Sequence, residues 1–200
     1  MTSSILNALS LPAFMVDTRH VVVAWNGPCE LLTGIAAADV LGTNDHWKGF
    51  YDEPRPCLAD LVLDNLLADA SRFYSLHERT EFASDGYKAE GWFDDLKGKR
   101  RYLTFEAKPL FSGDKIIGAI EVLQDITRHK EAEEQLKLSA SVFENASEGI
   151  VITSQDNFII SANRALEGLT GFRTDEMLGR NPRLFASQCH PRSFFQKMWQ

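Results

Sequence analysis

The feature that most constrains the fold is the stretch 86–143, where three strand patterns lead directly into a charged helical pattern. Apolar and polar residues alternate along Arg101–Pro109 and along Lys115–Gln124, and a weaker pattern covers Tyr87–Phe93. Alternation with a period of two is typical of strands that are buried on one face. Because turn residues separate the three patterns, we expect consecutive antiparallel strands.

Three apolar residues of the last strand pattern share one face. Ile116, Ile120 and Val122 are separated by even numbers of residues, so a pleated strand places them on the same side. Leu103 and Phe105 share a face of the preceding pattern in the same way. We expect these faces to form the sheet side of the domain interior.

The last strand pattern ends at Asp125-Ile126-Thr127, and a polar helical pattern over Arg128–Leu138 begins at once. A side-chain oxygen of Thr127 or Asp125 can cap this helix, because it can accept hydrogen bonds from unpaired N–H groups of the first turn. A sheet that continues directly into an exposed helix is suited to transmit a conformational change. We therefore expect Asp125 and Thr127 to relay a signal.

Shorter elements precede the sheet. Asn26 is a good N-cap, and Gly34 is suited to end the helix that follows it. Pro56 predicts the first turn of a helix that reaches Leu66, and residues 71–77 are expected to continue it after a bend. The other expected elements are a helix over Ser3–Leu9, strands over Ala13–Val16 and Val21–Trp25, a helix over Ala36–Leu41 and an irregular aromatic segment over Asn44–Asp52.

An internal repeat indicates two copies of one domain. The landmarks Asn26, Leu32-Thr33-Gly34 and Leu41-Gly42 recur, each 137 residues later, as Asn163, Leu169-Thr170-Gly171 and Leu178-Gly179. Only 37 residues follow Asn163, too few for the three late strands. We expect this second copy to be only partly ordered, or to be covered by a neighbouring copy, because a half-sheet exposes unpaired edges.

In order and spacing these residues resemble PAS domains, which are sensory modules of bacterial signalling proteins. The resemblance implies an α+β fold, a five-stranded antiparallel sheet with helices on one side and a pocket between them. It covers both copies. In the first copy it rests on Trp25-Asn26, Leu32-Thr33-Gly34, Leu41-Gly42, Pro109-Leu110, Ile117-Gly118 and Asp125-Ile126-Thr127, and in the second on Phe143-Glu144-Asn145-Ala146, Asn163, Thr170-Gly171, Glu176, Leu178-Gly179 and Asn181-Pro182-Arg183.

The resemblance also implies an organisation and a role. Residues 1–127 are expected to form a PAS sensor domain, 128–143 a coiled-coil-like linker helix, and 144–200 the N-terminal part of a second PAS domain. We expect a non-catalytic sensory and dimerisation module that relays a pocket or redox signal to an output domain in the same chain. The first expectation for that output is a diguanylate cyclase or cyclic-di-GMP phosphodiesterase. The alternatives are the sensor region of a histidine kinase, a haem-based gas or redox sensor, and a ligand-free spacer.

A small-molecule pocket is expected where aromatic residues before the helix at Pro56 face the sheet. Apolar walls with a few polar groups suit ligand sites, although the same residues would also serve as ordinary core. Arg55 could hold a carboxylate through two hydrogen bonds, or remain a surface residue. The pocket candidates are His46, Trp47, Phe50, Tyr51, Arg55, Leu58, Val62, Phe73, Trp92, Leu103, Phe105 and Ile120.

Two cofactors are alternatives to our first expectation, which is that none is bound. Light-sensing relatives bond a flavin to a cysteine where this chain has Pro182, and proline cannot form a thiol adduct, so only noncovalent flavin remains. Haem needs an axial imidazole, which His46 or His77 could supply beside the pocket. Outside haem we expect no metal.

The composition restricts the class of protein. The net charge of −7 argues against nucleic acid as a partner. Cys29, Cys57 and Cys189 form no C-x-x-C pair, which argues against a disulfide framework or a zinc site and favours a reducing cytoplasm. We find neither a signal peptide nor an apolar run long enough for a membrane span, and no catalytic motif that would indicate an enzyme.

The charged helix carries a weak coiled-coil pattern. Six residues along it are separated alternately by three and four positions, a spacing that is typical of a coiled-coil seam. Leu136 is the apolar residue near the middle of this seam. We therefore expect a homodimer through this helix and the PAS surfaces, with Leu136 in the signal relay. The alternative is a solvated helix that only joins two domains. The seam residues are Ile126, His129, Glu133, Leu136, Ala140 and Phe143.

Overall fold

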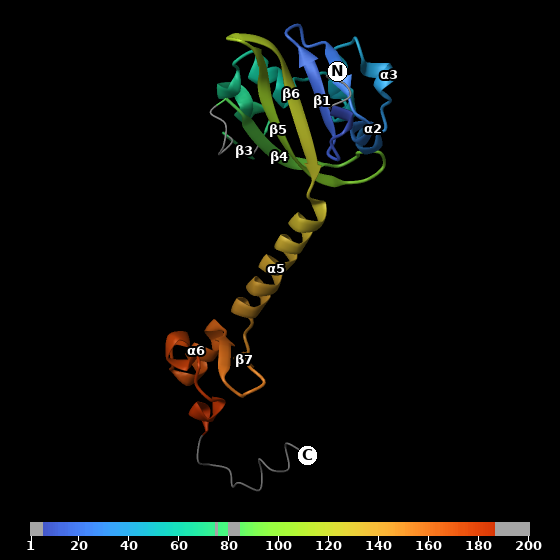
Figure 1. The fold of residues 1–200 in the computed structure, drawn as a ribbon. Helices are drawn as coiled ribbons and strands as arrows, with labels where there is room; N and C mark the ends of the chain where they lie inside the picture. Colours follow the sequence, from blue (N-terminus) through green and yellow to red (C-terminus); the bar gives the residue numbers. More distant parts are fainter. Residues whose placement is uncertain (1–5, 75, 80–84, 187–200) are drawn as a thin grey trace. The chain divides into compact units, whose positions relative to one another are not determined.

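The computed structural model describes residues 6–74, 76–79 and 85–186. The chain divides into two compact units, Met1–Lys130 and Glu131–Gln200 (Figure 1). Among the helices of the described residues, none combines the length and the apolar composition that a membrane span requires.

Six antiparallel strands form the sheet of the first unit, in the order β2-β1-β6-β5-β4-β3. Strands β1 and β6, which are the first and the last along the sequence, lie side by side (Figure 1). Pairing of β4 with β5 and of β5 with β6 confirms the predicted consecutive antiparallel strands. The strands are β1 (Ala13–Asp17), β2 (Val22–Trp25), β3 (Leu76–Arg79), β4 (Tyr87–Phe93), β5 (Arg101–Ser112) and β6 (Lys115–Asp125).

Strand β3 is an addition to the predicted five-stranded sheet. We expected residues 71–77 to continue a helix, but Leu76–Arg79 pairs with β4. The helix ends early because Asn65 adopts a left-handed φ of 54°, and only a short 3-10 helix, η2 (Leu67–Arg72), follows it. His77 therefore lies in an edge strand and not in a helix.

Short helices cover one face of this sheet. Asn26 and Gly34 cap the first of them as predicted, Gly34 with a φ of 80° that suits a residue without Cβ. Pro56 lies outside the helix that it was expected to begin, because Cys57 takes the N-cap position. Residues 6 and 7 are helical, and 3–5 of the expected first helix lie outside the described residues. The helices are α2 (Gly27–Thr33), α3 (Ala37–Val40), η1 (His46–Gly49) and α4 (Leu58–Leu63).

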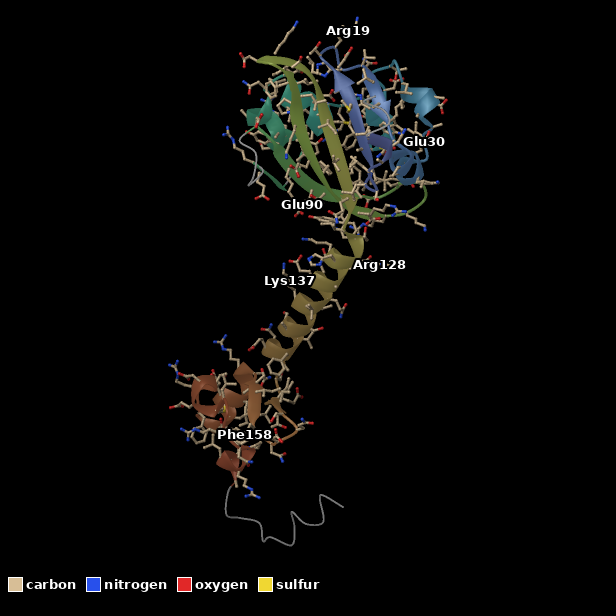
Figure 2. The ribbon with its side chains drawn as sticks, viewed as in Figure 1. Arg19, Glu30, Glu90, Arg128, Lys137 and Phe158 are labelled. Atoms are coloured by element: carbon tan, nitrogen blue, oxygen red, sulfur yellow. The ribbon has the colours of Figure 1, made fainter. Side chains whose placement is uncertain are left out.

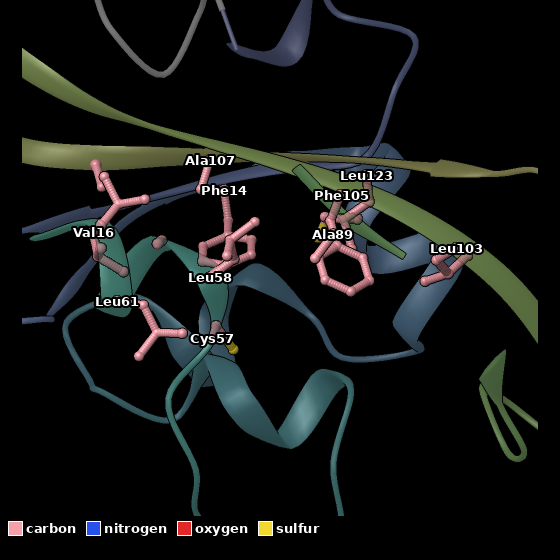
Figure 3. Close-up of a cluster of buried hydrophobic side chains, with 14 of the residues drawn as sticks. Phe14, Val16, Cys57, Leu58, Leu61, Ala89, Leu103, Phe105, Ala107 and Leu123 are labelled. Carbon is pink, nitrogen blue, oxygen red and sulfur yellow. The ribbon is translucent and has the colours of Figure 1, made fainter. Parts of the chain in front are cut away.

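The main hydrophobic core lies between the sheet and helix α4. Figure 3 shows Leu58 of α4 close to Phe14 and Leu61 of α4 on the side of Val16, and all four side chains are buried. Burying one such side chain contributes about 1.5–3 kcal/mol. This packing fixes α4 beneath β5 and β6, and it also fixes the polar groups at the start of α4.

Strand β6 presents the opposite face from the one that we predicted. Ala119 and Leu123 point into the main core, whereas Ile120 and Val122 pack on the other side of the sheet near Leu6. The strand therefore buries Ala119 and Leu123 beneath the helices. Ile120 lies on the far face of the sheet from the pocket to which we assigned it, because alternation defines two faces without saying which of them is covered by helices.

A buried asparagine amide joins the start of the first unit. The Asn26 Oδ1 accepts hydrogen bonds from the backbone N–H groups of Ala13 at 2.9 Å and Cys29 at 3.0 Å. Its Nδ2 donates to the carbonyl oxygens of Leu6 at 3.1 Å and Leu11 at 2.9 Å. One side chain thus holds the N-terminal segment, strand β1 and helix α2 together.

The second unit repeats this arrangement. The Asn163 Oδ1 accepts from the N–H groups of Ile150 at 2.7 Å and Leu166 at 3.2 Å, and its Nδ2 donates to the carbonyls of Phe143 at 3.0 Å and Glu148 at 2.9 Å. Each of the four partners lies 137 residues after its counterpart around Asn26. The predicted internal repeat is confirmed at the level of single hydrogen bonds.

The described part of the second unit is small. A two-stranded antiparallel sheet and short helices enclose a core around Ile159 and Met177. Residues 187–200 lie outside the described residues, so the expected incompleteness of this copy stays a prediction. The elements are β7 (Val151–Thr153), β8 (Ile159–Ala162), α6 (Arg164–Thr170), α7 (Thr174–Met177) and η3 (Pro182–Phe185).

The helix after β6, α5 (Thr127–Asn145), extends beyond the polar pattern of Arg128–Leu138 and covers the residues 128–143 that were expected to form the linker helix. None of its residues is buried, and Leu136 is 71% exposed. Figure 2 shows the side chains of α5, with Arg128 and Lys137 labelled, projecting outward from the helix. Leu136, Leu138 and Val142 of this helix are therefore exposed within the described part of one chain.

The two asparagines allow a matched test of this fold. We expect Asn26→Ala to destabilise the first unit by about 2–4 kcal/mol, because it leaves buried backbone groups unpaired. Urea unfolding followed by tryptophan fluorescence measures this, since three of the four tryptophans, Trp25, Trp47 and Trp92, belong to the first unit. Asn163→Ala should leave that transition unchanged. Equal shifts from the two variants would contradict the separate roles of the two amides.

Candidate functional site

A cleft of about 930 Å³ opens beside strand β4, a volume within the usual range for small-molecule sites. Its walls come from the segment between η1 and α4, from Phe73-Tyr74, from β4 with the loop after it, and from β5. The lining residues are Thr33, Lys48, Gly49, Phe50, Tyr51, Asp52, Glu53, Arg55, Phe73, Tyr74, Glu90, Gly91, Trp92, Phe93, Asp94, Asp95, Leu96, Lys97, Tyr102 and Phe105.

Arg55 is a polar group of the cleft whose guanidinium is held in a defined orientation. Its guanidinium carbon lies 4.0 Å from the centre of the Tyr51 ring and 5.2 Å from those of Phe73 and Tyr74. One terminal nitrogen donates to the Phe73 carbonyl at 3.0 Å, whereas the buried Nε has no hydrogen-bond partner among the described residues. Three rings thus fix a cation whose donors are not all used.

Two tyrosine hydroxyls line the same wall. The hydroxyl groups of Tyr51 and Tyr74 lie 3.3 Å apart, and burial raises the pKa of both far above the ordinary value. Both therefore remain neutral at physiological pH. The cleft offers a ligand a positive group and two hydroxyl groups between aromatic faces.

The structure brings half of the pocket candidates together. Phe50, Tyr51, Arg55, Phe73, Trp92 and Phe105 line the cleft. The others do not line it: Leu58, Val62 and Leu103 belong to the closed core, Trp47 packs against that core, Ile120 lies on the far face of the sheet, and His46 lies in a separate polar cluster. The side chain of His77 lies outside the described residues.

His46 belongs to a chain of polar side chains beneath the sheet. Its Nε2 lies 2.8 Å from the Asp60 Oδ2, and the His20 Nδ1 lies 2.7 Å from the Asp60 Oδ1. Asp64 contacts the other nitrogen of His20 at 3.2 Å. His46 is 2% exposed and does not line the cleft, so its position does not fit an axial ligand of a haem bound there.

Asp60 is held as an anion by this chain. Burial alone would raise its pKa, but hydrogen bonds with His46 and His20 and from the backbone N–H of Cys57 at 2.8 Å lower the pKa below its ordinary value. The pKa of His20 moves upward, because its contacts with Asp60 and Asp64 outweigh its partial burial. These polar side chains therefore place charged groups close to the start of helix α4.

Glu121 on strand β6 is a buried acid that the sequence analysis missed. It is 3% exposed, and its Oε2 accepts a hydrogen bond from the Ala59 N–H in the first turn of α4 at 2.8 Å. Burial, reinforced by the nearby charge of Asp60, raises its pKa to about 8. Its position in phase with Ala119 and Leu123 was the sequence signal that it points inward.

The joint between β6 and α5 is held by side-chain hydrogen bonds. Asp125 pairs with Arg101, and its Oδ1 accepts from the Thr127 N–H at 3.0 Å and from the Thr127 hydroxyl at 2.5 Å. Of the two predicted capping residues, Asp125 is therefore the one that binds the first N–H of α5. The Thr127 Oγ1 instead accepts from the N–H of Tyr102 at 2.9 Å.

Tyr102 connects this joint to the cleft. Its backbone binds the joint on both sides, because its carbonyl also accepts from the Ile126 N–H at 3.0 Å. Tyr102 lines the cleft, its ring packs edge-on against Trp92 with 5.0 Å between ring centres, and its hydroxyl lies 3.1 Å from the Glu90 carboxylate. One residue thus contacts both the cleft and the start of α5.

Comparison with known families matches both units. The model described as "PAS domain" matches residues 11–128, and the model described as "PAS fold" matches residues 138–200. The first match alone covers more than half of the chain.

Individual relatives are signalling proteins that are much longer than the matched part. Halobacterial transducer protein 9 of Halobacterium salinarum is 31% identical over 140 residues, which is 68% of this chain and 28% of the relative. The nitrogen fixation regulatory protein of Klebsiella oxytoca is 42% identical over 60 residues, 30% of this chain and 12% of that protein. The chain thus spans less than a third of the length of each.

The comparison with solved structures gives partial matches. An RNA-binding light-oxygen-voltage receptor is 21% identical with a TM-score of 0.49, covering 70% of this chain and 36% of that one. The PAS domain from Bordetella pertussis BvgS is 16% identical with a TM-score of 0.41, covering 70% of this chain and 95% of that one.

The buried carboxyl of Glu121 predicts a pH-dependent stability. Its pKa is about 8 in the folded state and near 4.5 in an exposed chain, so between these values the folded state holds a proton that the unfolded state has released. Raising the pH through this window destabilises the protein. Above the window, the stability that the bound proton contributes is lost completely. One pKa unit corresponds to about 1.4 kcal/mol. The free energy of unfolding of Glu121→Gln should therefore rise by a few kcal/mol relative to that of the original chain between about pH 5 and pH 9.

Urea unfolding at several pH values measures this difference. The ionisable groups that face Glu121 are Asp60 and Cys57 of α4, Cys29 of α2, and the two cleft tyrosines, and all of them are retained in the variant. Glu131→Gln on the exposed helix α5 is the matched control and should show no such trend. Parallel stability curves for Glu121→Gln and the original chain would contradict the buried, protonated carboxyl.

Proposed function

This chain belongs to the PAS domain family, and from that membership we propose that its first unit is a ligand-responsive sensor that acts on a downstream domain through helix α5. Its relatives include a transducer and a regulator, so a role in signal transduction is supported by the family. The ligand, the relay and the output are the parts of the role that we propose here.

The observation that carries the relay is the double position of Tyr102. Tyr102 lines the cleft, and its backbone N–H and carbonyl bind the residues that join β6 to α5. A ligand that displaces Tyr102 also moves these two backbone groups. The hydrogen bonds to Thr127 and Ile126 must then shift with them or break, which changes the start of α5.

Arg55 supports a ligand with an anionic group. A guanidinium that is fixed between aromatic rings and retains a free, buried N–H is suited to bind a carboxylate, because a charged acceptor strengthens the hydrogen bond. The rings of Phe50, Phe73 and Trp92 would bury the apolar remainder. The proposed ligand is therefore a small aromatic or branched carboxylate.

The exposed helix α5 supports assembly of two copies of this chain. Leu136 is exposed within one chain, and a second α5 packed along the seam from Ile126 to Phe143 would cover it. Polar residues at His129 and Glu133 weaken such a seam, so that small changes at its start can alter its register. The proposed output is a domain of the same chain. A diguanylate cyclase or cyclic-di-GMP phosphodiesterase is our first proposal for it, and a histidine kinase is the alternative. No catalytic step is assigned to these residues themselves.

Ligand binding by Arg55 can be tested with a panel of simple carboxylates, for example benzoate, phenylacetate and isovalerate. We expect at least one to raise the melting temperature of the original chain and Arg55→Gln to weaken its binding at least tenfold, because a charge-assisted pair is lost. Arg100→Gln is the matched control, since Arg100 also stacks on an aromatic ring, at 4.0 Å from Trp92, but does not line the cleft. Equal losses in the two variants, or no response to any carboxylate, would refute the assignment of Arg55.

The relay predicts a specific role for one hydroxyl group. Thr127→Val removes the acceptor of the Tyr102 N–H and should speed amide hydrogen exchange in the first turn of α5 about tenfold, the equivalent of about 1.4 kcal/mol, while β4 keeps its protection. Thr127→Ser retains the hydroxyl and should behave as the original chain. If valine and serine give the same exchange rates, the hydroxyl does not hold the joint.

A further inference from the structure

Three buried side chains of different chemistry converge at the start of helix α4. The donor atoms of His46, Cys57 and Asp60 all lie within 4.8 Å of one another. Helix α4 supplies two of them, Cys57 as its N-cap and Asp60 in its first turn, and the 3-10 helix η1 supplies the third. We call these residues the His–Cys–Asp cluster. It lies outside the cleft, whose walls include none of the three.

The donor set of this cluster is that of a zinc-type site. Zinc binds imidazole nitrogen, thiolate sulfur and carboxylate oxygen at about 2.0–2.3 Å, which places the ligand atoms of a tetrahedral site roughly 3.2–3.8 Å apart. The separation of 2.8 Å between the His46 Nε2 and the Asp60 Oδ2 is shorter than this range. Insertion of an ion between them would require an opening of about half an ångström, a side-chain movement and not a rearrangement of the fold.

One nitrogen of the cluster is unsatisfied in its buried position. His46 is almost fully buried, and its Nδ1 has no hydrogen-bond partner within the described residues. A buried polar atom without a partner costs about 1–3 kcal/mol, so such atoms call for an explanation. A histidine that binds a metal commonly uses one ring nitrogen for the ion and is oriented through the other by a carboxylate or a carbonyl. In this site the Nε2 that contacts Asp60 would take the ion, so Asp60 would be a ligand and not the group that orients the ring.

Charge balance also favours a divalent ion. A bound ion would take the thiolate of Cys57 and the carboxylate of Asp60, and the Cys57 thiol proton would be released to solvent. Two negative ligands and a doubly positive ion leave no net charge, which a site buried in an apolar core requires. Monovalent and trivalent ions would leave the buried group charged.

A polar path connects the cluster to the surface. His20 contacts Asp60 from outside and Asp64 contacts His20, and their side chains are 30% and 48% exposed. An ion and the released proton can exchange along this path. His20 is at the same time placed to orient the Asp60 carboxylate, as outer partners of metal ligands commonly do.

We propose that the His–Cys–Asp cluster binds one divalent transition-metal ion of the zinc class, with His46, Cys57 and Asp60 as ligands and a fourth position open. The absence of a C-x-x-C pair led the sequence analysis to expect no such site. The fold instead assembles the ligands from two separate elements. The bound ion would fix both ends of the segment 46–57, and this inference stands independently of the proposed carboxylate ligand.

Cobalt is a suitable probe, because its thiolate and tetrahedral complexes have characteristic absorption bands. The full chain carrying Cys189→Ser, reduced and stripped of metal with a chelator, is titrated with Co²⁺ alone and then with Zn²⁺. We expect one ion per chain, a thiolate-to-cobalt charge-transfer band, and loss of that band when Zn²⁺ displaces the cobalt. A titration of this folded protein without a thiolate band overturns the proposal, whatever the variants do.

Variants assign the ligands. Cys57→Ala should abolish the charge-transfer band, and His46→Gln should weaken Co²⁺ binding at least tenfold. Cys29→Ala is the matched control, because Cys29 is also a buried free thiol but lies outside the cluster. Circular dichroism of the metal-free variants checks their folding, and His46→Gln decides the assignment if Cys57→Ala does not fold. A band that persists in Cys57→Ala, or that is lost equally in Cys29→Ala, would contradict the proposed ligands.

Discussion

The fold depends first on one buried amide. The side chain of Asn26 uses both its oxygen and its nitrogen on backbone groups, and these groups belong to the N-terminal segment, strand β1 and helix α2. Because β1 pairs with β6, this contact also positions the strand that leads into α5. In the second unit, the side-chain amide of Asn163 makes the equivalent hydrogen bonds to backbone groups.

The second constraint is the start of helix α4, where the apolar core contains several polar groups. The unpaired N–H groups and the partial positive charge of a helix N-terminus favour carboxylates. Asp60 binds the Cys57 N–H and Glu121 binds the Ala59 N–H, so two acids from different elements satisfy one short helix. The pKa of Asp60 falls because its contacts with His46, His20 and the Cys57 N–H outweigh its burial, whereas burial, reinforced by the charge of Asp60, raises that of Glu121.

Local signals in the sequence predicted a large part of the fold. Alternation located β4, β5 and β6, residue types located the caps at Asn26 and Gly34, and constant spacing revealed the repeat, because each of these depends on neighbours in the chain. The inward face of β6 was missed because it depends on α4, which lies about 60 residues earlier and covers the face with Glu121. The His46–Asp60 contact and the closed-core positions of Leu58, Val62 and Leu103 were missed for the same reason, since packing between elements decides them.

The segment between His46 and Cys57 links these features physically. Its two ends lie at the polar cluster, and its middle supplies Phe50, Tyr51 and Arg55 to the cleft. A change in the separation of His46 and Asp60 would displace one end of this segment relative to the wall that carries Arg55. On the other side of the cleft, strand β5 carries Phe105 and Tyr102, which lie three residues apart and therefore on opposite faces of the strand. The cleft is therefore bounded on one side by the segment whose ends meet at the polar cluster and on the other by the strand that holds the start of α5.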